Sequence, residues 1–206
     1  LTGEESDRYV IEKYALRLII SGRELLRKTD SAEARQPIIV ANPAFDQDFE
    51  DKRYVIGALS RKDLSGIEPT ERSKTAVGLL PRVNGLPQTA VEAQGILPSL
   101  NAYAGKSSAL ADDRKALEFL VKSYPRPVVA SFATHGYFLN RQQAPSIVNP
   151  LLRCGLLLAG CNDPNSVVEN DDGVLTGLEI AGLDYRGTQL VVLSACETGL
   201  GDIENG

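Results

Sequence analysis

The sequence contains no methionine, no tryptophan and a single histidine, and aromatic residues make up only 6% of its 206 residues. Its three cysteines are Cys154, Cys161 and Cys196. An odd number of cysteines in a chain of this size does not suit a disulfide framework, so we expect reduced thiols and a cytoplasmic location. Because the chain has no methionine to start translation, we expect it to be part of a longer protein.

Long apolar runs and an excess of basic residues are also missing. No run reaches the roughly 18 to 20 apolar residues of a membrane span, and no charged-then-apolar secretion signal opens the chain. The 27 acidic residues outnumber the 22 basic ones, giving a net charge of −5, and no basic stripe follows the chain. We therefore expect no membrane and no nucleic-acid partner. This length suits one compact domain, residues 1–206.

Residues that could hold a metal ion are few and poorly spaced. Cys154 and Cys161 could join His135, but their spacing fits no common zinc pattern and three ligands are too few. Four acidic residues in the polar stretch 162–173 miss the spacing of a calcium loop, so we expect them in a solvated turn: Asp163, Glu169, Asp171 and Asp172. We expect no metal site and no cofactor.

Two apolar runs end at residues with reactive side chains. Residues 190–195 stop at Cys196 and then break into glycines, which predicts a buried strand that delivers a thiol to a loop. Residues 128–133 end at Thr134, His135 and Gly136 in the same way. Two such strand ends can bring one imidazole to one thiol. The alternative is a buried structural cysteine and a hydrogen-bonded histidine that never meet.

A paired thiol and imidazole have a definite chemistry. The thiolate is the nucleophile, and a free cysteine with a pKa of about 8.5 is mostly protonated at neutral pH. A neighbouring imidazole supplies the missing activation. The glycine after His135 lets a scissile carbonyl approach the backbone, so the N–H groups of Gly136 and Cys196 can point at a developing oxyanion. The two runs therefore predict nucleophilic catalysis if they meet.

Residues 132–136 (Phe-Ala-Thr-His-Gly) and 193–201 (Leu-Ser-Ala-Cys-Glu-Thr-Gly-Leu-Gly) resemble the two signature blocks of the CHAT domain family. These are caspase-like and separase-like cysteine peptidases that are often attached to TPR repeats. Further agreement covers most of the chain and is weakest at residues 47–84; it includes residues 9–15, 21–26, 42–46, 149–152 and 175–180. The resemblance implies that Cys196 is the nucleophile and that His135 is the general base and acid.

The same resemblance carries expectations about substrate and partners. It implies cleavage of proteins or peptides and a preference for a basic residue before the cut, which needs a carboxylate in the pocket. Asp202 is the candidate, and an exposed loop acid is the alternative. Caspase-like domains place further strands and a helix after the nucleophile, and this chain stops ten residues after Cys196. We therefore expect the C-terminal part to be absent from this chain, with a small-subunit segment or chain, and TPR repeats, as partners. The open explanations are a cleaved large subunit, a disordered or unobserved remainder, and a deliberately shortened chain; we favour cleavage or loss, including self-processing, in the loop after Cys196.

Periodicity, caps and breakers divide the chain into strands and helices. Strands are expected at residues 9–12, 16–20, 38–41, 128–133, 151–159 and 190–195. Helices are expected from Ser21, from Pro87 until Pro98 ends it, from Asp112 or Asp113 to Tyr124, and from Thr176 to about Gly182. Residues 46–85 carry many charges, glycines and prolines and are expected to form a surface loop, an insertion in the domain.

Helices that alternate with fully apolar strands indicate an α/β fold with a mainly parallel sheet covered on both faces. The resemblance narrows this to the three-layer caspase-like fold. In such sheets ligands bind beyond the carboxyl ends of the strands, where His135 and Cys196 are expected.

Two other functions remain open. One is a catalytically idle interaction domain that docks onto TPR repeats or another protein, although such a domain has no chemical need for His135 or Cys196. The other is a thiol or serine hydrolase of small molecules, but the chain has no Gly-x-Ser-x-Gly elbow and no second histidine.

Overall fold

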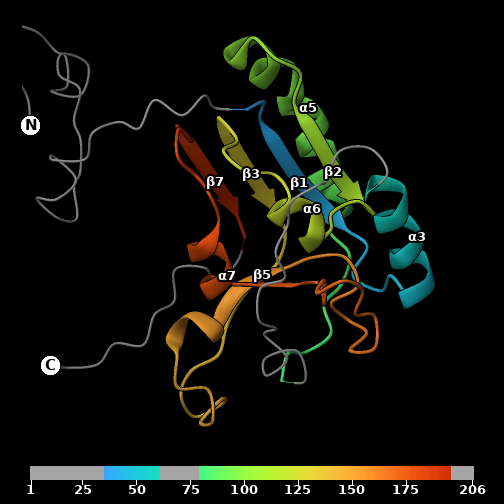
Figure 1. The fold of residues 1–206 in the computed structure, drawn as a ribbon, viewed down its shortest axis with the longest axis vertical. Helices are drawn as coiled ribbons and strands as arrows, with labels where there is room; N and C mark the ends of the chain where they lie inside the picture. Colours follow the sequence, from blue (N-terminus) through green and yellow to red (C-terminus); the bar gives the residue numbers. More distant parts are fainter. Residues whose placement is uncertain (1–34, 61–78, 196–206) are drawn as a thin grey trace, which may run out of the picture. The chain divides into compact units, whose positions relative to one another are not determined.

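The computed structural model describes residues 35–60 and 79–195, which all belong to one compact unit (Figure 1). The strands expected at 9–12 and 16–20, the helix expected from Ser21, Cys196 and Asp202 lie outside these residues. In the described part of the chain, no helix is long and apolar enough to cross a membrane.

The larger sheet has four parallel strands: β1 (Ile38–Pro43), β2 (Ala109–Asp113), β3 (Val129–Ala133) and β7 (Leu190–Ser194). Their order across the sheet is β2-β1-β3-β7. Near-continuous apolar runs such as those of β1 and β3 are typical of parallel strands that are buried on both faces. The α/β class and the mainly parallel sheet are thus confirmed, and the arrangement is consistent with a caspase-like fold.

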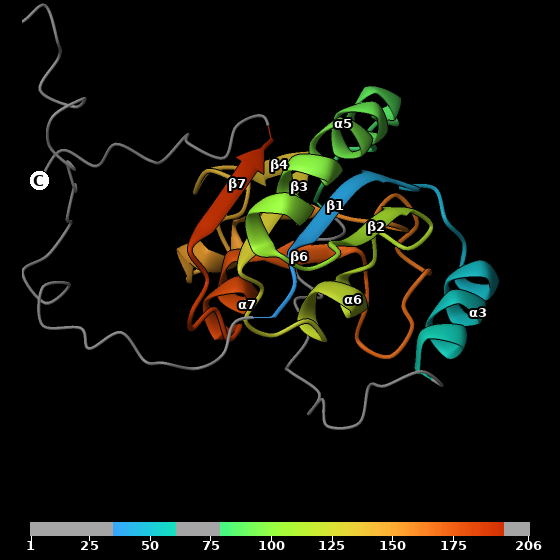
Figure 2. The ribbon, with the colours of Figure 1, turned by 90° about the horizontal axis from the view of Figure 1, so that it is seen from above.

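Helices cover the two faces of this sheet, and alternate side chains of β1 pack on opposite faces. Ile39 and Ala41 pack against α5 (Pro87–Ala104). Ile38 and Val40 belong to a cluster on the opposite face, to which α6 (Glu118–Lys122) and α7 (Gly177–Gly182) contribute. Figure 2 shows α5 on one side of the strands and α6 and α7 on the other. The sheet and its two helical layers make three layers.

A second, smaller sheet contains three antiparallel strands. They are β4 (Gly136–Phe138), β5 (Cys154–Leu157) and β6 (Val174–Thr176), with β5 in the middle. A short 3₁₀-helix, η1 (Pro150–Leu152), precedes β5. The strand expected at 151–159 is therefore shorter and central, because residues 150–152 turn before the pairing begins.

Helix α7 begins where β6 ends, and its start follows the predicted capping box. The Thr176 hydroxyl accepts a hydrogen bond from the Glu179 N–H, and the Glu179 carboxylate accepts one from the Thr176 N–H. These two bonds satisfy backbone donors that the first turn of a helix otherwise leaves unpaired. The helix ends at Gly182, as the sequence predicts.

Helix α3 (Phe49–Ser60) occupies residues that the sequence analysis places in a surface loop, so that expectation is wrong there. Val55 and Ile56 are 8% and 1% exposed and pack with Leu117 in a core cluster. Contacts with distant residues thus stabilise a helix whose own sequence, with Gly57 and many charges, gives little indication of one. Whether residues 46–85 are an insertion stays a prediction.

Two further expectations about helices are wrong. Asp112 and Asp113 do not cap a helix: they end β2, which pairs with β1, and α6 begins only at Glu118. The short Ala-Leu-Ala-Asp-Asp segment has little strand propensity, and pairing with a buried neighbour decides its conformation. Helix α5 does not end at Pro98 either but continues to Ala104, where Gly105 adopts a left-handed conformation with φ of 61°.

Strand β7 is exposed, although the apolar run predicts a buried strand. Leu190, Val191, Val192 and Leu193 are 51%, 48%, 40% and 50% exposed. The strand pairs with β3 along one edge, and among the described residues no strand pairs with its other edge. The apolar run correctly predicts a strand, but it carries no information about what covers that strand.

Two acidic residues expected in a solvated turn are buried instead. Asp171 is 1% exposed; its Oδ1 lies 3.0 Å from Lys52 Nζ and its Oδ2 accepts a hydrogen bond from the Phe119 N–H at 2.8 Å. Asp172 is 8% exposed and accepts a hydrogen bond from the Val174 N–H. The polar loop 162–173 can enter the interior because buried partners satisfy its carboxylates.

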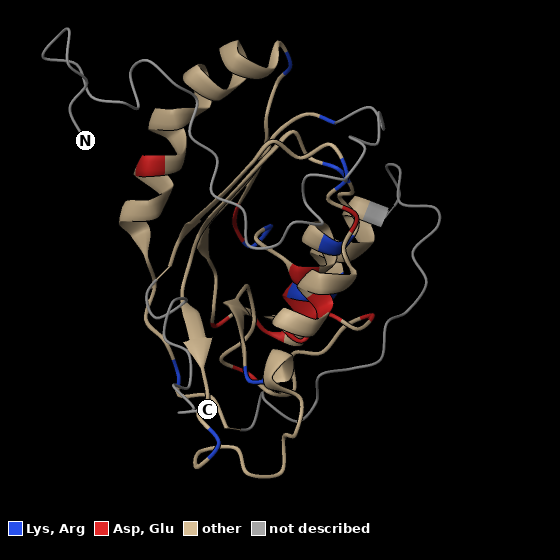
Figure 3. Cartoon of the chain, turned by 90° about the vertical axis from the view of Figure 1, so that its left-hand side faces the viewer, with Lys and Arg blue, Asp and Glu red and all other residues tan. Residues whose placement is uncertain are grey.

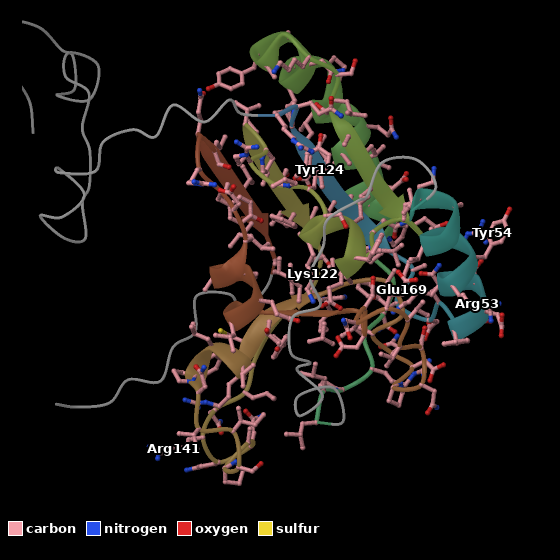
Figure 4. The ribbon with its side chains drawn as sticks, viewed as in Figure 1. Arg53, Tyr54, Lys122, Tyr124, Arg141 and Glu169 are labelled. Carbon is pink, nitrogen blue, oxygen red and sulfur yellow. The ribbon has the colours of Figure 1, made fainter. Side chains whose placement is uncertain are left out.

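Glu118 extends this buried polar cluster to α7. Its Oε2 accepts hydrogen bonds from the N–H groups of Asp172 and Gly173, and its Oε1 pairs with Lys122. The Nζ atom of Lys122, a residue labelled in Figure 4, also lies 2.7 Å from Glu179 Oε1. Burial raises the pKa of Glu118 well above 4.5, the neighbouring carboxylates of Asp171 and Asp172 raise it further, and Lys122 opposes them.

Candidate functional site

His135 lies where the chain leaves the parallel sheet and enters the antiparallel one. It follows Thr134, the residue after β3, and precedes Gly136, the first residue of β4. The Thr134 side chain is buried, and its hydroxyl donates to the Leu157 carbonyl at 2.5 Å. The Leu157 N–H donates to the His135 carbonyl at 2.8 Å. These bonds to β5 fix the backbone of the histidine between the two sheets.

The imidazole ring has two neighbours that orient it. Its centroid lies 5.3 Å from that of the Phe45 ring, at an interplanar angle of 45°. Its Nε2 lies 2.9 Å from the carbonyl oxygen of Asn84. A carbonyl oxygen only accepts hydrogen bonds, so Nε2 carries the proton in this contact and Nδ1 of the neutral ring is left as the base.

Sequence reasoning missed both neighbours of the ring. Phe45 falls within the 42–46 block that resembles the family, but its aromatic side chain gives no sign of the residue on which it packs. Asn84 acts through its backbone carbonyl, which every residue possesses, so no side-chain pattern could have identified it. It belongs to residues 79–86, which the structure describes as a turn and an irregular segment before α5.

Gly136 is the first residue of β4 and pairs with Leu156 of β5. It is partly exposed and adjoins His135, as an oxyanion donor would need to be. Cys196, its backbone N–H and Asp202 lie outside the described residues, so the structure does not test whether they meet His135 or Gly136.

The strands that lead to the two candidate residues are direct neighbours. Ala133, the last residue of β3, pairs in parallel with Ser194, the last residue of β7. Both strands therefore end at the same edge of the sheet. His135 and Cys196 each follow two residues after this pair in the sequence.

An apolar cavity of about 330 Å³ lies between the two sheets, and Val191 and Leu193 of β7 line one side of it. Phe132 of β3, Leu156 of β5 and Ile180 of α7 contribute to its walls. Val191 and Leu193, which line the cavity, are also about half exposed.

The other two cysteines are poor nucleophiles. Both are free thiols. Burial raises the pKa of Cys161 to about 12, and burial also raises the pKa of Cys154. A thiol reacts as its thiolate, which neither residue forms readily at neutral pH. Among the residues that the structure describes, no group of three His, Cys, Asp or Glu side chains could hold a metal ion.

Comparisons with curated proteins and with solved structures gave no match for this chain. A family model described as CHAT domain matches residues 1–206, the whole sequence. The match agrees with the α/β architecture and with the two motif blocks. The chain therefore belongs to the CHAT domain family, which is related to the caspase-like cysteine peptidases.

Proposed function

We propose that this domain is a cysteine endopeptidase in which Cys196 is the nucleophile and His135 is the general base and acid. The observation that carries the proposal is the register of β3 and β7. Because Ala133 pairs with Ser194, the chain segments that hold the two residues leave neighbouring strands at the same sheet edge. Adjacent strands lie about 4.8 Å apart, a separation that suits contact between an imidazole and a thiol.

The histidine's hydrogen bond suggests which nitrogen acts. Nε2 donates to Asn84, so Nδ1 takes the proton of the Cys196 thiol. The thiolate attacks the scissile carbonyl carbon, and the N–H groups of Gly136 and Cys196 stabilise the resulting oxyanion. The C–N bond then breaks as Nδ1–H protonates the leaving amine, which produces an acyl-enzyme. A water molecule that gives its proton to His135 attacks this thioester and releases the acid product and the free thiol.

The specificity and self-processing parts of the proposal rest on the family. A basic residue before the cut would pair with a carboxylate, for which Asp202 is the candidate. Cleavage of the chain by itself would occur in an exposed segment near the nucleophile, since loop tips rich in glycine and polar residues are preferred sites of nicking.

We further propose that a C-terminal small-subunit segment or a separate chain covers β7. Four large aliphatic side chains that are about half exposed support this partner, because an uncovered apolar strand with a free edge pairs readily with another strand. The cavity beside Val191 and Leu193 leaves room for apolar side chains of such a segment. A cytoplasmic location and attachment to TPR repeats complete the proposal.

The competing function is an idle interaction domain that docks onto TPR repeats or another protein. The same exposed β7 favours it, since a docking strand would use this edge whether or not catalysis occurs. Cleavage separates the two functions.

The test is digestion of a mixed peptide library by the full-length protein that contains this domain. The variants Cys196→Ala and His135→Ala are assayed beside Cys161→Ala, which removes another, partly buried thiol whose pKa is raised. We expect cuts with the wild type and with Cys161→Ala only, and intact masses that reveal self-cleavage in the same two proteins. Cuts that persist in Cys196→Ala would exclude this nucleophile, and no cuts in any protein across plausible activators would favour the docking domain.

A further inference from the structure

Asn162 makes an unusual set of contacts with residues 79–86, the segment whose Asn84 carbonyl contacts the His135 ring. Its side-chain Oδ1 accepts a hydrogen bond from the Val83 N–H at 2.9 Å, and its Nδ2 donates to the Val83 carbonyl at 2.9 Å. The amide thus bonds both backbone groups of one residue, as a neighbouring strand would. Val83 directly precedes Asn84, whose carbonyl accepts the hydrogen bond from His135.

A third contact fixes the direction of the Asn162 amide. Nδ2 also donates to Asp46 Oδ1 at 3.0 Å. The opposite orientation would put the amide oxygen against two acceptors, the Val83 carbonyl and the Asp46 carboxylate, and would put the NH₂ group against the Val83 N–H. Asn162 is 8% exposed, so water does not readily replace these bonds.

The backbone of Asn162 supports the other neighbour of the histidine. Its N–H donates to the Phe45 carbonyl at 3.0 Å, and the Phe45 ring packs against His135. One residue therefore contacts the segments that supply both ring neighbours. The side chains of Leu80, Val83 and Leu86 pack against the core and hold residues 79–86 down. Such apolar packing is non-directional, whereas the amide bonds set the direction in which the peptide groups point.

We infer that Asn162 is a positioning residue for His135, which acts by aiming the Asn84 carbonyl at Nε2. It thereby holds the proton on Nε2 and leaves Nδ1 as the base. The catalytic consequence rests on the proposed peptidase function, but the hydrogen bond itself does not, so the two can fail separately.

The single histidine of the chain makes this bond directly observable. We would label the untagged chain with ¹⁵N-histidine and record the imidazole ¹⁵N–¹H resonance, together with its exchange with solvent, at a pH where the ring is neutral. Asn162→Asp puts carboxylate oxygens against the Val83 carbonyl and Asp46, and Asn162→Ala removes the contacts without repulsion. Asn165→Asp, the same change at an exposed residue three positions along, is the matched control.

We expect a protected Nε2–H in the wild type and in Asn165→Asp. Exchange should be at least about fivefold faster in both Asn162 variants, which is the factor for losing ~1 kcal/mol of net hydrogen-bond stabilisation. If the full-length protein cleaves peptides, kcat should fall with little change in KM, because Asn162 is 8% exposed and acts on the histidine through Asn84. Lost protection with no cleavage in any protein would support the positioning role and refute only the peptidase.

Three results would overturn the inference. The first is unchanged exchange in both Asn162 variants. The second is an equal change in Asn165→Asp. The third is loss of the dispersed native spectrum in both Asn162 variants, because Asn162 would then be a requirement of the whole fold and not of the histidine's surroundings.

Discussion

The two edges of the parallel sheet are built on opposite principles. Beyond β2 lies α3 (Figure 1), and α6 covers the adjoining face of the sheet. Acidic and basic residues lie side by side on these helices (Figure 3), and the buried ones are paired, as in Lys52 with Asp171. At the other edge, β7 carries no charge and exposes four aliphatic side chains. The first edge pairs its buried charges within the described chain. The second leaves apolar surface that the described residues do not cover, and this is the surface on which we propose that a partner binds.

The largest effect is expected at the polar edge, from Lys52→Met. This change leaves Asp171 buried without its cation, and breaking a buried pair typically costs about 3 to 5 kcal/mol of unfolding free energy. The expected loss is measured by urea unfolding of the full chain. The matched control is Arg114→Ala, which breaks the ion pair with Asp51, where the arginine side chain is 55% exposed; it should cost less than about 1 kcal/mol. Equal costs would show that the Lys52 pair is as solvated as the surface pair.

A second pair of variants compares the core with the open edge. Phe132 and Leu193 are register partners on neighbouring strands, but they are 3% and 50% exposed. Phe132→Ala should lower the unfolding free energy by about 3 to 5 kcal/mol, and Leu193→Ala, which removes a half-exposed side chain, by about 1.

Repeating Leu193→Ala in the full-length protein sharpens the comparison. A cost that rises toward about 2 to 5 kcal/mol there would mean that another segment covers β7. A cost that stays near 1 kcal/mol would contradict the proposed small-subunit partner.

The pH dependence of stability should carry the signature of the polar edge. The pKa of Glu118 is raised in the folded state above its unfolded-state value near 4.5. Its contribution to stability is therefore fully present at pH values below 4.5 and is lost as the pH rises toward the folded-state pKa. Unfolding free energies measured between about pH 4.5 and 8 should therefore fall more steeply in the wild type than in Glu118→Gln, by up to ~1.4 kcal/mol per pH unit. Parallel curves would show that Glu118 is ionised like a surface carboxylate.

The smallest effect is expected from removing a partly buried thiol, that of Cys161. With the pKa of Cys161 raised to about 12, its thiolate is almost absent at neutral pH. Cys161→Ser should leave the initial rate of iodoacetamide labelling unchanged, as followed by intact mass. Slower labelling in the variant would mean that Cys161 is more open than the structure indicates.

The sequence predicts best the elements whose signals are local. The apolar runs predicted β1, β3 and β7, the Thr176–Glu179 box predicted the start of α7, and Gly182 predicted its end. Strand β2 and helix α3 were missed because pairing with β1 and burial of Val55 and Ile56 outweigh weak local preferences. The prediction of a solvated turn was wrong for Asp171, because its buried partner Lys52 is 119 positions away in the sequence.

The candidate site divides in the same way. His135 and Gly136 were found from a strand end and a motif, which are both visible in the sequence. The support of the histidine was not, because a backbone carbonyl at Asn84 and an amide at Asn162 acquire their roles only through tertiary contacts. Whether Cys196 joins them stays a prediction.

The register of the larger sheet also has a kinetic consequence. Ile38 pairs with Ala109 and Ala130, and Val129 pairs with Leu190, so each pairing closes a loop of about 60 residues or more. The smaller sheet starts from a nearby contact, Phe138 with Cys154. Because closing long loops costs more entropy before contacts repay it, we expect slow folding in which β4 and β5 pair before the parallel strands do. In pulsed hydrogen exchange, amides of β4 and β5 should gain protection before those of β1 and β7, and the reverse order would refute this.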